Sequence, residues 1–206
     1  MTLQARLLGC FPIIHGLSIF GGITLWFRKP SLVGLIGVVF CIYGLPLICY
    51  RCHRAVYGDP EGIYDLAGSQ YTPWWGGYQF QLLFNTFDGF EKLLRLFPGA
   101  YQMWLRLWGA KIGKKVFFTS RFRTLDRPHL DIGDGAVFGY DAGISSHVIT
   151  PRNSQISLLV KKVTVGSGAF VGAHCYLAPG AVVGPDTCLS YGQKVAIDEI
   201  ADREKP

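Results

Sequence analysis

Histidines and carboxylates in the C-terminal half carry the side chains best suited to acid–base chemistry. His129 and His147 lie eighteen residues apart, and His174 follows them. An imidazole changes its protonation state near neutral pH, so a histidine can accept a proton or bind a metal ion. We expect His129 either to orient His147 or contact a substrate, or to be a surface residue at a turn. Asp126 and Asp131 are nearby carboxylates that could orient an imidazole.

A second motif lies in the N-terminal quarter. Cys49, Cys52 and His53 form a C-x-x-C-H string, which is the spacing used for c-type haem attachment. The string is short and overlaps the end of an apolar segment, so a membrane c-type haem protein is kept as an alternative only. The six cysteines lack the spacing of a disulfide-linked secreted domain, which indicates a reducing compartment.

A period of six residues organises the chain around the histidines. From Val165 the sequence reads VGSGAF, VGAHCY, LAPGAV, VGPDTC and LSYGQK, and earlier blocks begin at Ile132 and, in part, at Ile112. One inward aliphatic residue in every six predicts short parallel strands joined by tight turns, with three strands to a triangular coil. A coil then has eighteen residues, so His129 and His147 are expected to stack on successive coils. The expected inward positions are Ile132, Phe138, Ile144, Val165, Val171, Leu177, Val183, Leu189 and Val195. The fold class is therefore expected to be mainly β, a parallel β-helix.

The register of this repeat slips twice. Between Ile112 and Ile132 the spacing exceeds a multiple of six by two residues, and between Ile144 and Val165 it exceeds one by three. The second slip predicts a loop at about residues 148–162 that leaves the coil directly after His147. Long loops in a compact solenoid are usually functional.

The N-terminal part has the composition of a membrane segment. Only 17% of the chain is charged, against about 25% in typical soluble domains. Residues 9–27 and 31–50 are apolar, each about long enough to cross a bilayer as a helix. Flanking basic residues explain the net charge of +6 and weakly favour a cytoplasmic C-terminal domain. His15, inside the first stretch, is expected either to be functional or to reach out to the interface.

Between the apolar hairpin and the repeat, a loop-like stretch precedes a helical pattern. Its apolar stripe runs from Phe80 to Phe97, and a shorter helix follows with Tyr101, Trp104, Leu105 and Trp108. Such helices are expected to lie at the membrane interface, with packing on the β-helix as the alternative. We therefore divide the chain into a transmembrane helical hairpin (1–54), a loop with amphipathic interfacial helices (55–110) and the β-helix (111–206).

The repeat region resembles the hexapeptide-repeat acyltransferases, in particular the branch of exopolysaccharide, maltose and xenobiotic acetyltransferases. Three segments carry the resemblance: WLRLWGAKIGKKV (104–116), IGDGAVFGYDAGISSH (132–147) and KVTVGSGAFVGAHCYLAPGAVVG (162–184). The resemblance implies a left-handed β-helix, a homotrimer with sites shared between subunits, and acyl-CoA as co-substrate with no permanently bound cofactor. It also implies that His147, the histidine just before the excursion, is the general base that deprotonates the acceptor.

Other positions are candidates for the site as well. Substrate-binding candidates are His129, Asp126, Asn153 and His174, and cofactor-binding candidates are Phe170, Ala173 and Tyr191. Two of these depart from the family pattern, because Phe170 stands where many members have tryptophan and Tyr191 replaces a small residue. No metal is expected, since the H-x4-H ligand pair of the zinc hydratases with this repeat is absent.

The sequence thus predicts an acyltransferase, most simply an O-acetyltransferase, at a bacterial inner membrane. It would move an acetyl or longer acyl group from acyl-CoA or acyl carrier protein to a lipid-linked or amphiphilic acceptor, which Trp74, Trp75, Phe84 and Trp104 could guide. A nucleic-acid partner is not expected, because no basic stripe carries interleaved aromatic residues. A non-catalytic β-helix scaffold of a membrane enzyme complex is the main alternative.

Overall fold

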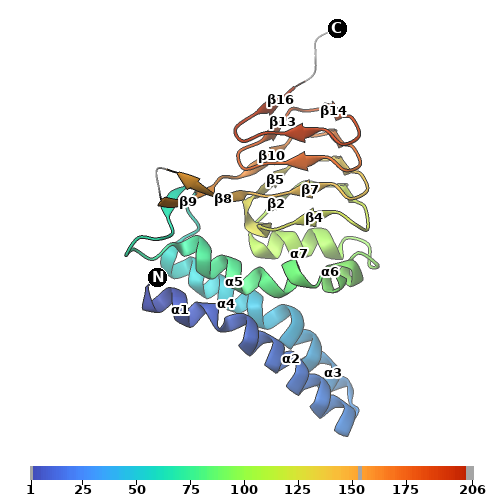
Figure 1. Ribbon diagram of the computed structural model, residues 1–206. Helices are drawn as coiled ribbons and strands as arrows, with labels where there is room; N and C mark the ends of the chain where they lie inside the picture. The colour runs from blue at the N-terminus through green and yellow to red at the C-terminus, as the bar shows by residue number, and fades with distance from the viewer. Residues whose placement is uncertain (1, 153–154, 203–206) are drawn as a thin grey trace. The chain divides into compact units, whose positions relative to one another are not determined.

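The computed structural model describes residues 2–152 and 155–202 (Figure 1). Its contacts form two compact units, one of residues up to 60 together with 67–87, and the other of 61–66 together with residues from 88 onward. The first unit is helical, and the second contains the β-helix. The three-part division at residues 54 and 110 stays a prediction.

The helical unit begins with two long apolar stretches. Its elements are α1 (Leu3–Gly9), α2 (Phe11–Arg28), α3 (Leu32–Val39), the π-helical turn η1 (Phe40–Gly44), α4 (Leu45–Tyr57) and α5 (Pro73–Thr86). Leu3–Arg28 and Leu32–Tyr57 each form 26 residues of helix, mostly exposed within the structure. At about 1.5 Å per residue, each is long enough to cross a hydrocarbon core. By length and composition alone, both could span a membrane.

His15 compensates for a missing backbone hydrogen bond in the second apolar stretch. Pro46 has no N–H, so it cannot donate to the carbonyl of Ile42 four residues earlier. His15 is 1% exposed, and its Nε2 lies 3.0 Å from the carbonyl oxygen of Cys41 and 3.2 Å from that of Ile42. An Nε2–H that is shared between these two carbonyl oxygens replaces the hydrogen bond that the helix backbone does not supply. His15 is therefore a structural donor and does not reach out of the helix pair.

The second unit is built around three parallel sheets. Sheet 1 contains β2 (Lys111–Ile112), β5 (Leu130–Ile132), β10 (Val163–Val165), β13 (Val182–Val183) and β16 (Ile200–Ala201). Sheet 2 contains β3 (Phe117–Phe118), β6 (Val137–Phe138), β11 (Phe170–Val171) and β14 (Cys188–Leu189). Sheet 3 contains β4 (Arg123–Thr124), β7 (Gly143–Ile144), β12 (Tyr176–Leu177) and β15 (Lys194–Val195). The chain visits the sheets in the order 1, 2, 3, so each round is one triangular coil (Figure 1).

The strand registers place both slips of the repeat at one corner. The first coil is twenty residues long, since Lys111 pairs with Asp131 and Arg123 with Gly143. The second coil is 33 residues long, since Asp131 pairs with Thr164. The coils from β10 onward are eighteen residues long, as in the pairing of Thr164 with Val182. The extra residues fall between β4 and β5 in one coil and between β7 and β10 in the next. Both insertions therefore emerge where sheet 3 turns into sheet 1, which we call the base corner.

The inward positions expected from the hexads are confirmed. All nine are at most 2% exposed, and Ile112 and Phe118 extend the same core into the first coil. The small residue after each aliphatic residue is explained by coil stacking. A Cβ on Gly133 would lie 2.5 Å from the backbone nitrogen of Ser167, so only glycine allows the next coil to approach. The parallel β-helix is thus confirmed by its own registers, and its left-handed sense stays a prediction.

The helical pattern of residues 80–97 is divided between the two units. α5 ends at Thr86, and α6 (Gly89–Leu94) and α7 (Ala100–Trp108) belong to the second unit. Tyr101, Trp104, Leu105 and Trp108 of α7 are buried, and α7 packs on β2 at the first coil. The aromatic face of α7 is therefore core, as the alternative interpretation had it. Trp74, Phe84 and Trp104 are also buried, so the expectation that they line an acceptor path is wrong.

The excursion after His147 is a sheet and not an irregular loop. β8 (His147–Arg152) and β9 (Gln155–Val160) pair as an antiparallel hairpin, and β1 (Gly62–Asp65) adds to the outer edge of β9. Figure 1 shows this hairpin leaving the stack of coils sideways. Residues 62–65, which had been expected to be loop, therefore form a third strand beside the excursion. We call the three strands the excursion sheet.

Candidate active site

The base corner brings Asp126 and His147 into direct contact. Nδ1 of His147 lies 2.7 Å from Oδ2 of Asp126. The Asp126 side chain is 1% exposed and the His147 side chain 12%. A carboxylate can only accept hydrogen bonds, so Nδ1 is the protonated nitrogen of the neutral ring and Nε2 carries the lone pair. This tautomer suits a histidine that takes a proton through Nε2.

Local structure fixes Asp126 in this position. Asp126 precedes the 3-10 turn η2 (Arg127–His129), whose Pro128 restricts the backbone, and its carbonyl accepts the N–H of His129 at 3.2 Å. Oδ2 of Asp126 also accepts the backbone N–H of Ser146 at 3.1 Å. The two extra residues of the first coil thus build the turn that carries the carboxylate.

A buried ion pair ties this turn to the preceding helices. Nε of Arg127 lies 2.6 Å from Oε1 of Glu91 in α6, and the same oxygen accepts the indole N–H of Trp104 at 2.8 Å. The Arg127 and Glu91 side chains are 1% and 6% exposed. Sequence reasoning missed this pair, because no local pattern relates residues 91 and 127. Charged residues are almost never fully buried unless paired, so only their burial in the fold marks them as a unit.

His129 does not lie one coil below His147. The expected stacking assumed an eighteen-residue coil, whereas the coil here has twenty residues. His129 ends η2, is 4% exposed, and its carbonyl accepts the hydroxyl of Ser146 at 3.0 Å. The stacked arrangement is therefore wrong, and His129 is also not a surface residue. Asp131 lies in β5 with its carboxylate 3.4 Å from Lys111 Nζ.

A groove runs over the outer face of sheet 3 toward the base corner. Its cavity volume is about 320 Å³. At one end, His174 Nδ1 lies 3.4 Å from Asp141 Oδ2, and Arg123 Nη2 lies 2.9 Å from Asp141 Oδ1. At the other end the groove is lined by Leu125 and Ile144, close in sequence to Asp126 and His147. The lining residues thus extend across sheet 3 from His174 to Leu125, the residue before Asp126.

The remaining expected positions are spread over the β-helix. Ala173 and Tyr191 lie in turns between sheets 2 and 3, and the Tyr191 ring is 5.1 Å from the His174 ring. Phe170 lies on the outer face of sheet 2 and is 43% exposed. Asn153 lies outside the described residues. Within one chain, the structure therefore brings Asp126, His129 and His147 together at one corner, and Ala173, His174 and Tyr191 at another.

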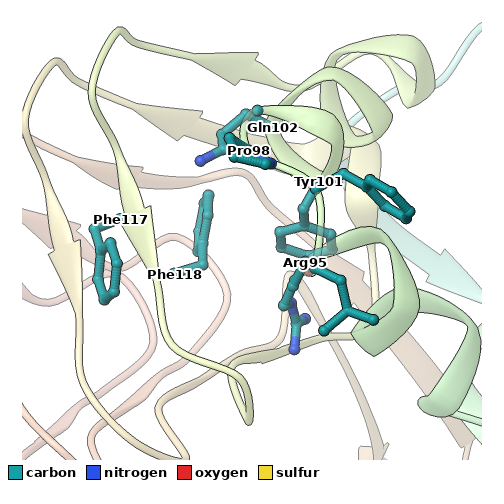
Figure 2. A pocket seen from close by; sticks show the side chains of 9 residues that line it. Arg95, Pro98, Tyr101, Gln102, Phe117 and Phe118 are labelled. Carbon is teal, nitrogen blue, oxygen red and sulfur yellow. The ribbon is translucent and has the colours of Figure 1, made fainter.

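Another hollow in the second unit lacks an acid–base pair. Figure 2 shows Arg95, Tyr101 and Gln102 across from Phe117 and Phe118, around a cavity of about 350 Å³. The Arg95 guanidinium donates to the carbonyls of Ser120 and Phe122 at 2.7 and 2.8 Å, and it lies 4.1 Å from the centre of the Tyr101 ring. Its lining residues include no histidine or carboxylate. The lining of this hollow therefore lacks the acid–base side chains expected of the site.

The C-x-x-C-H string does not fit a haem. A c-type haem needs a nitrogen of the motif histidine as an iron ligand. Nε2 of His53 instead lies 2.6 Å from the hydroxyl of Tyr71, and His53 is 8% exposed. A Cβ on Gly76 of α5 would lie 2.6 Å from that same nitrogen, so α5 closes the space beside it. His53 is built into the packing of α4 and α5.

Comparison with known proteins gives only distant likenesses. No family model matches the chain. No curated protein matches it either. Among solved structures it is similar to a hexapeptide-repeat acetyltransferase from Vibrio cholerae (11% identity, 60% of this chain and 84% of that one, TM-score 0.44). It is also similar to a maltose O-acetyltransferase from Clostridium difficile (16% identity, the same coverage, TM-score 0.39).

A third likeness extends over more of the chain at lower quality. It is to serine acetyltransferase isoform 3 from Entamoeba histolytica, with 11% identity over 87% of this chain and 75% of that one, and a TM-score of 0.20. All three identities are below 25% and all three TM-scores below 0.5, so these likenesses assign no activity. The strand registers and the buried hexad positions of the chain itself establish the parallel β-helix.

Proposed function

We propose that the protein is an acyltransferase in which His147 is the general base and Asp126 is a positioning residue. The observation that carries this proposal is the 2.7 Å contact between His147 Nδ1 and the buried carboxylate of Asp126. It selects the tautomer with the lone pair on Nε2. Neither a covalent nucleophile nor a metal is required for transfer from a thioester, because the thioester is already activated.

In the proposed reaction, His147 Nε2 takes the proton of an acceptor hydroxyl or amine as that atom attacks the thioester carbonyl carbon. The tetrahedral intermediate then collapses, the carbon–sulfur bond breaks, and the imidazolium returns the proton to the leaving thiolate. Asp126 stabilises the imidazolium that forms between these two steps. General base catalysis of this kind contributes about 10²- to 10⁴-fold.

The donor is proposed to be acyl-CoA, or an acyl carrier protein, lying along the outer face of sheet 3. The groove there leads from His174 and Asp141 to Leu125, which precedes Asp126. Arg123, which lines this groove and pairs with Asp141, carries a guanidinium of the kind that binds phosphate groups. Acyl-CoA is consumed as a co-substrate in this scheme, and no resident cofactor takes part.

We further propose a homotrimer held at a membrane. The outer face of sheet 2 carries a column of Phe117, Val137, Phe170 and Cys188 in register, of which Phe117 is 59% exposed. An exposed apolar column of this kind is suited to contact between copies. The two 26-residue apolar helices are long and apolar enough to serve as an anchor. We propose that the anchor lies in a bacterial inner membrane, with the β-helix on the cytoplasmic side. Such an anchor favours a lipid-linked or amphiphilic acceptor.

The proposal is tested by replacing the base. The full chain, purified in nanodiscs, is incubated with radiolabelled acetyl-CoA and either a membrane lipid extract or a short water-soluble alcohol. We expect His147→Ala to lower transfer about 10²- to 10⁴-fold while CoA still binds in calorimetry and the oligomer stays intact. Full activity in this variant would refute the assignment of the base. Absence of CoA binding by the wild type would instead favour the scaffold alternative.

A further inference from the structure

The excursion sheet presents an apolar face that begins at His147. Side chains alternate between the two faces of a strand, and directly paired residues share a face. His147 pairs with Val160, Ile149 with Leu158, and Pro151 with Ile156. On the third strand, Tyr64 pairs with Leu158. The described residues on the face of His147 are therefore His147, Ile149, Pro151, Ile156, Leu158, Val160, Gly62 and Tyr64.

The opposite face of the same sheet is mixed in character. Its described side chains are the polar Asp65, Thr150 and Ser157 and the aliphatic Ile63, Val148 and Leu159. Thr150 and Asp65 are exposed, as expected for a face toward water. No charged side chain lies on the described part of the His147 face, apart from the titratable His147 itself. The described part of the His147 face is thus free of charged side chains, whereas the opposite face mixes polar and aliphatic side chains.

Burial on the His147 face decreases away from the β-helix. Leu158 and Val160 are fully buried, whereas Ile149 is 47% and Ile156 is 52% exposed. The face therefore stays apolar beyond the area that the protein covers. Residues two apart on a strand are separated by about 7 Å, so Ile149 lies one step from His147 and the Pro151–Ile156 pair lies about 13 Å away. An accessible apolar track of that length leads directly away from the base.

We propose that this face binds the alkyl chain of the acceptor, with Ile149 and Ile156 as its contact residues; the inference rests on the proposed function of His147. The nitrogen that takes a proton must touch the acceptor oxygen. The carbon chain bonded to that oxygen then begins beside His147, where the apolar face begins. The thioester arm is proposed to lie in the groove over sheet 3, which is lined by no described residue of the excursion sheet. The acceptor class is therefore an alcohol or amine whose reactive group ends an extended hydrocarbon chain.

The chain offers a closely matched control. Ile63, on β1 of the same sheet, points to the opposite face and is 62% exposed. Threonine retains the branch at Cβ that favours strands, so Ile149→Thr, Ile156→Thr and Ile63→Thr make the same chemical change on the two faces. The melting temperature of each variant shows whether the sheet remains folded.

The experiment measures kcat/KM of the full chain in nanodiscs for n-alkyl acceptors of increasing length, with acetyl-CoA as donor and all acceptors below their micellar concentration. In the wild type we expect kcat/KM to rise about two- to fourfold for each added methylene while the track is being filled. Ile149→Thr and Ile156→Thr should flatten this rise, with a loss that grows with the length of the acceptor, and should act through KM rather than kcat. Ile63→Thr should keep the wild-type rise.

A second arm lengthens the acyl donor while the acceptor stays short. Flattening in the donor series alone would overturn the assignment to the acceptor, because the face would then hold the acyl chain. An equal loss for all acceptors, or an equal effect of Ile63→Thr, would overturn the proposal of an alkyl-binding face. In each of these cases transfer to the shortest acceptor still depends on His147. Only loss of that dependence would refute the proposed function itself.

Discussion

Replacing Asp126 by asparagine isolates the charge that faces His147. Oδ2 of Asp126 accepts from His147 Nδ1 at 2.7 Å and from the backbone N–H of Ser146 at 3.1 Å. An amide oxygen at the same place can accept both bonds, so the turn and the tautomer are expected to persist. The variant then differs from the wild type mainly in the negative charge beside the ring.

The size of the effect follows from the distance between the charges. When His147 becomes an imidazolium, the centres of positive and negative charge are about 4 Å apart, which corresponds to about 4 kcal/mol at an effective dielectric constant of 20. This energy equals about a thousandfold in rate, since each 1.36 kcal/mol is tenfold. Solvent screens part of it, because 12% of the His147 side chain is exposed. We therefore expect Asp126→Asn to lower kcat about 10²- to 10³-fold, with little change in KM.

The assay is steady-state transfer from radiolabelled acetyl-CoA in nanodiscs, together with nitrogen NMR of the His147 ring. The NMR signals show which ring nitrogen of His147 is protonated. If Asp126 only positioned the ring, kcat would not fall in a variant in which Nδ1 is still protonated. Asp131→Asn is the control, because Asp131 pairs with Lys111 away from His147, and we expect its rate to stay within about twofold. A rate within tenfold of the wild type for Asp126→Asn would refute the electrostatic argument.

Two further predictions concern stability. Glu91→Gln and Arg127→Met should each lower the free energy of unfolding by about 3–5 kcal/mol, because each leaves a buried charge unpaired. The double variant should lose much less than the sum of the two losses. Additive losses in denaturant titrations would contradict this expectation. His15→Phe should cost about 1–3 kcal/mol by removing the donor to the carbonyls beside η1. The cost should shrink in a Pro46→Ala background, where the new N–H can donate to the helix; equal melting-temperature losses in both backgrounds would show that His15 has another role.

Much of the β-helix was predictable because its repeat is local. Each hexad holds one inward residue, and the buried row from Ile132 to Val195 agrees with the expected positions. Both slips of register were also visible as departures from a multiple of six. The shape of the inserted segments was not predictable, because β1 pairs with β9 across about 95 residues of chain. A strand as short as four residues has little signal of its own until its partner is known.

The sequence by itself determined that His147 stands immediately before an insertion in a hexapeptide repeat, since this depends only on counting residues. Only the tertiary structure decided which residue faces it. The eighteen-residue spacing favoured His129. The two extra residues of the first coil instead place Asp126 beside the His147 ring, and they place His129 within the supporting 3-10 turn η2. The physical reason is that stacking in a solenoid follows the hydrogen-bond register between coils. An insertion at one corner shifts this register for the residues in that corner and leaves the register of the strands unchanged.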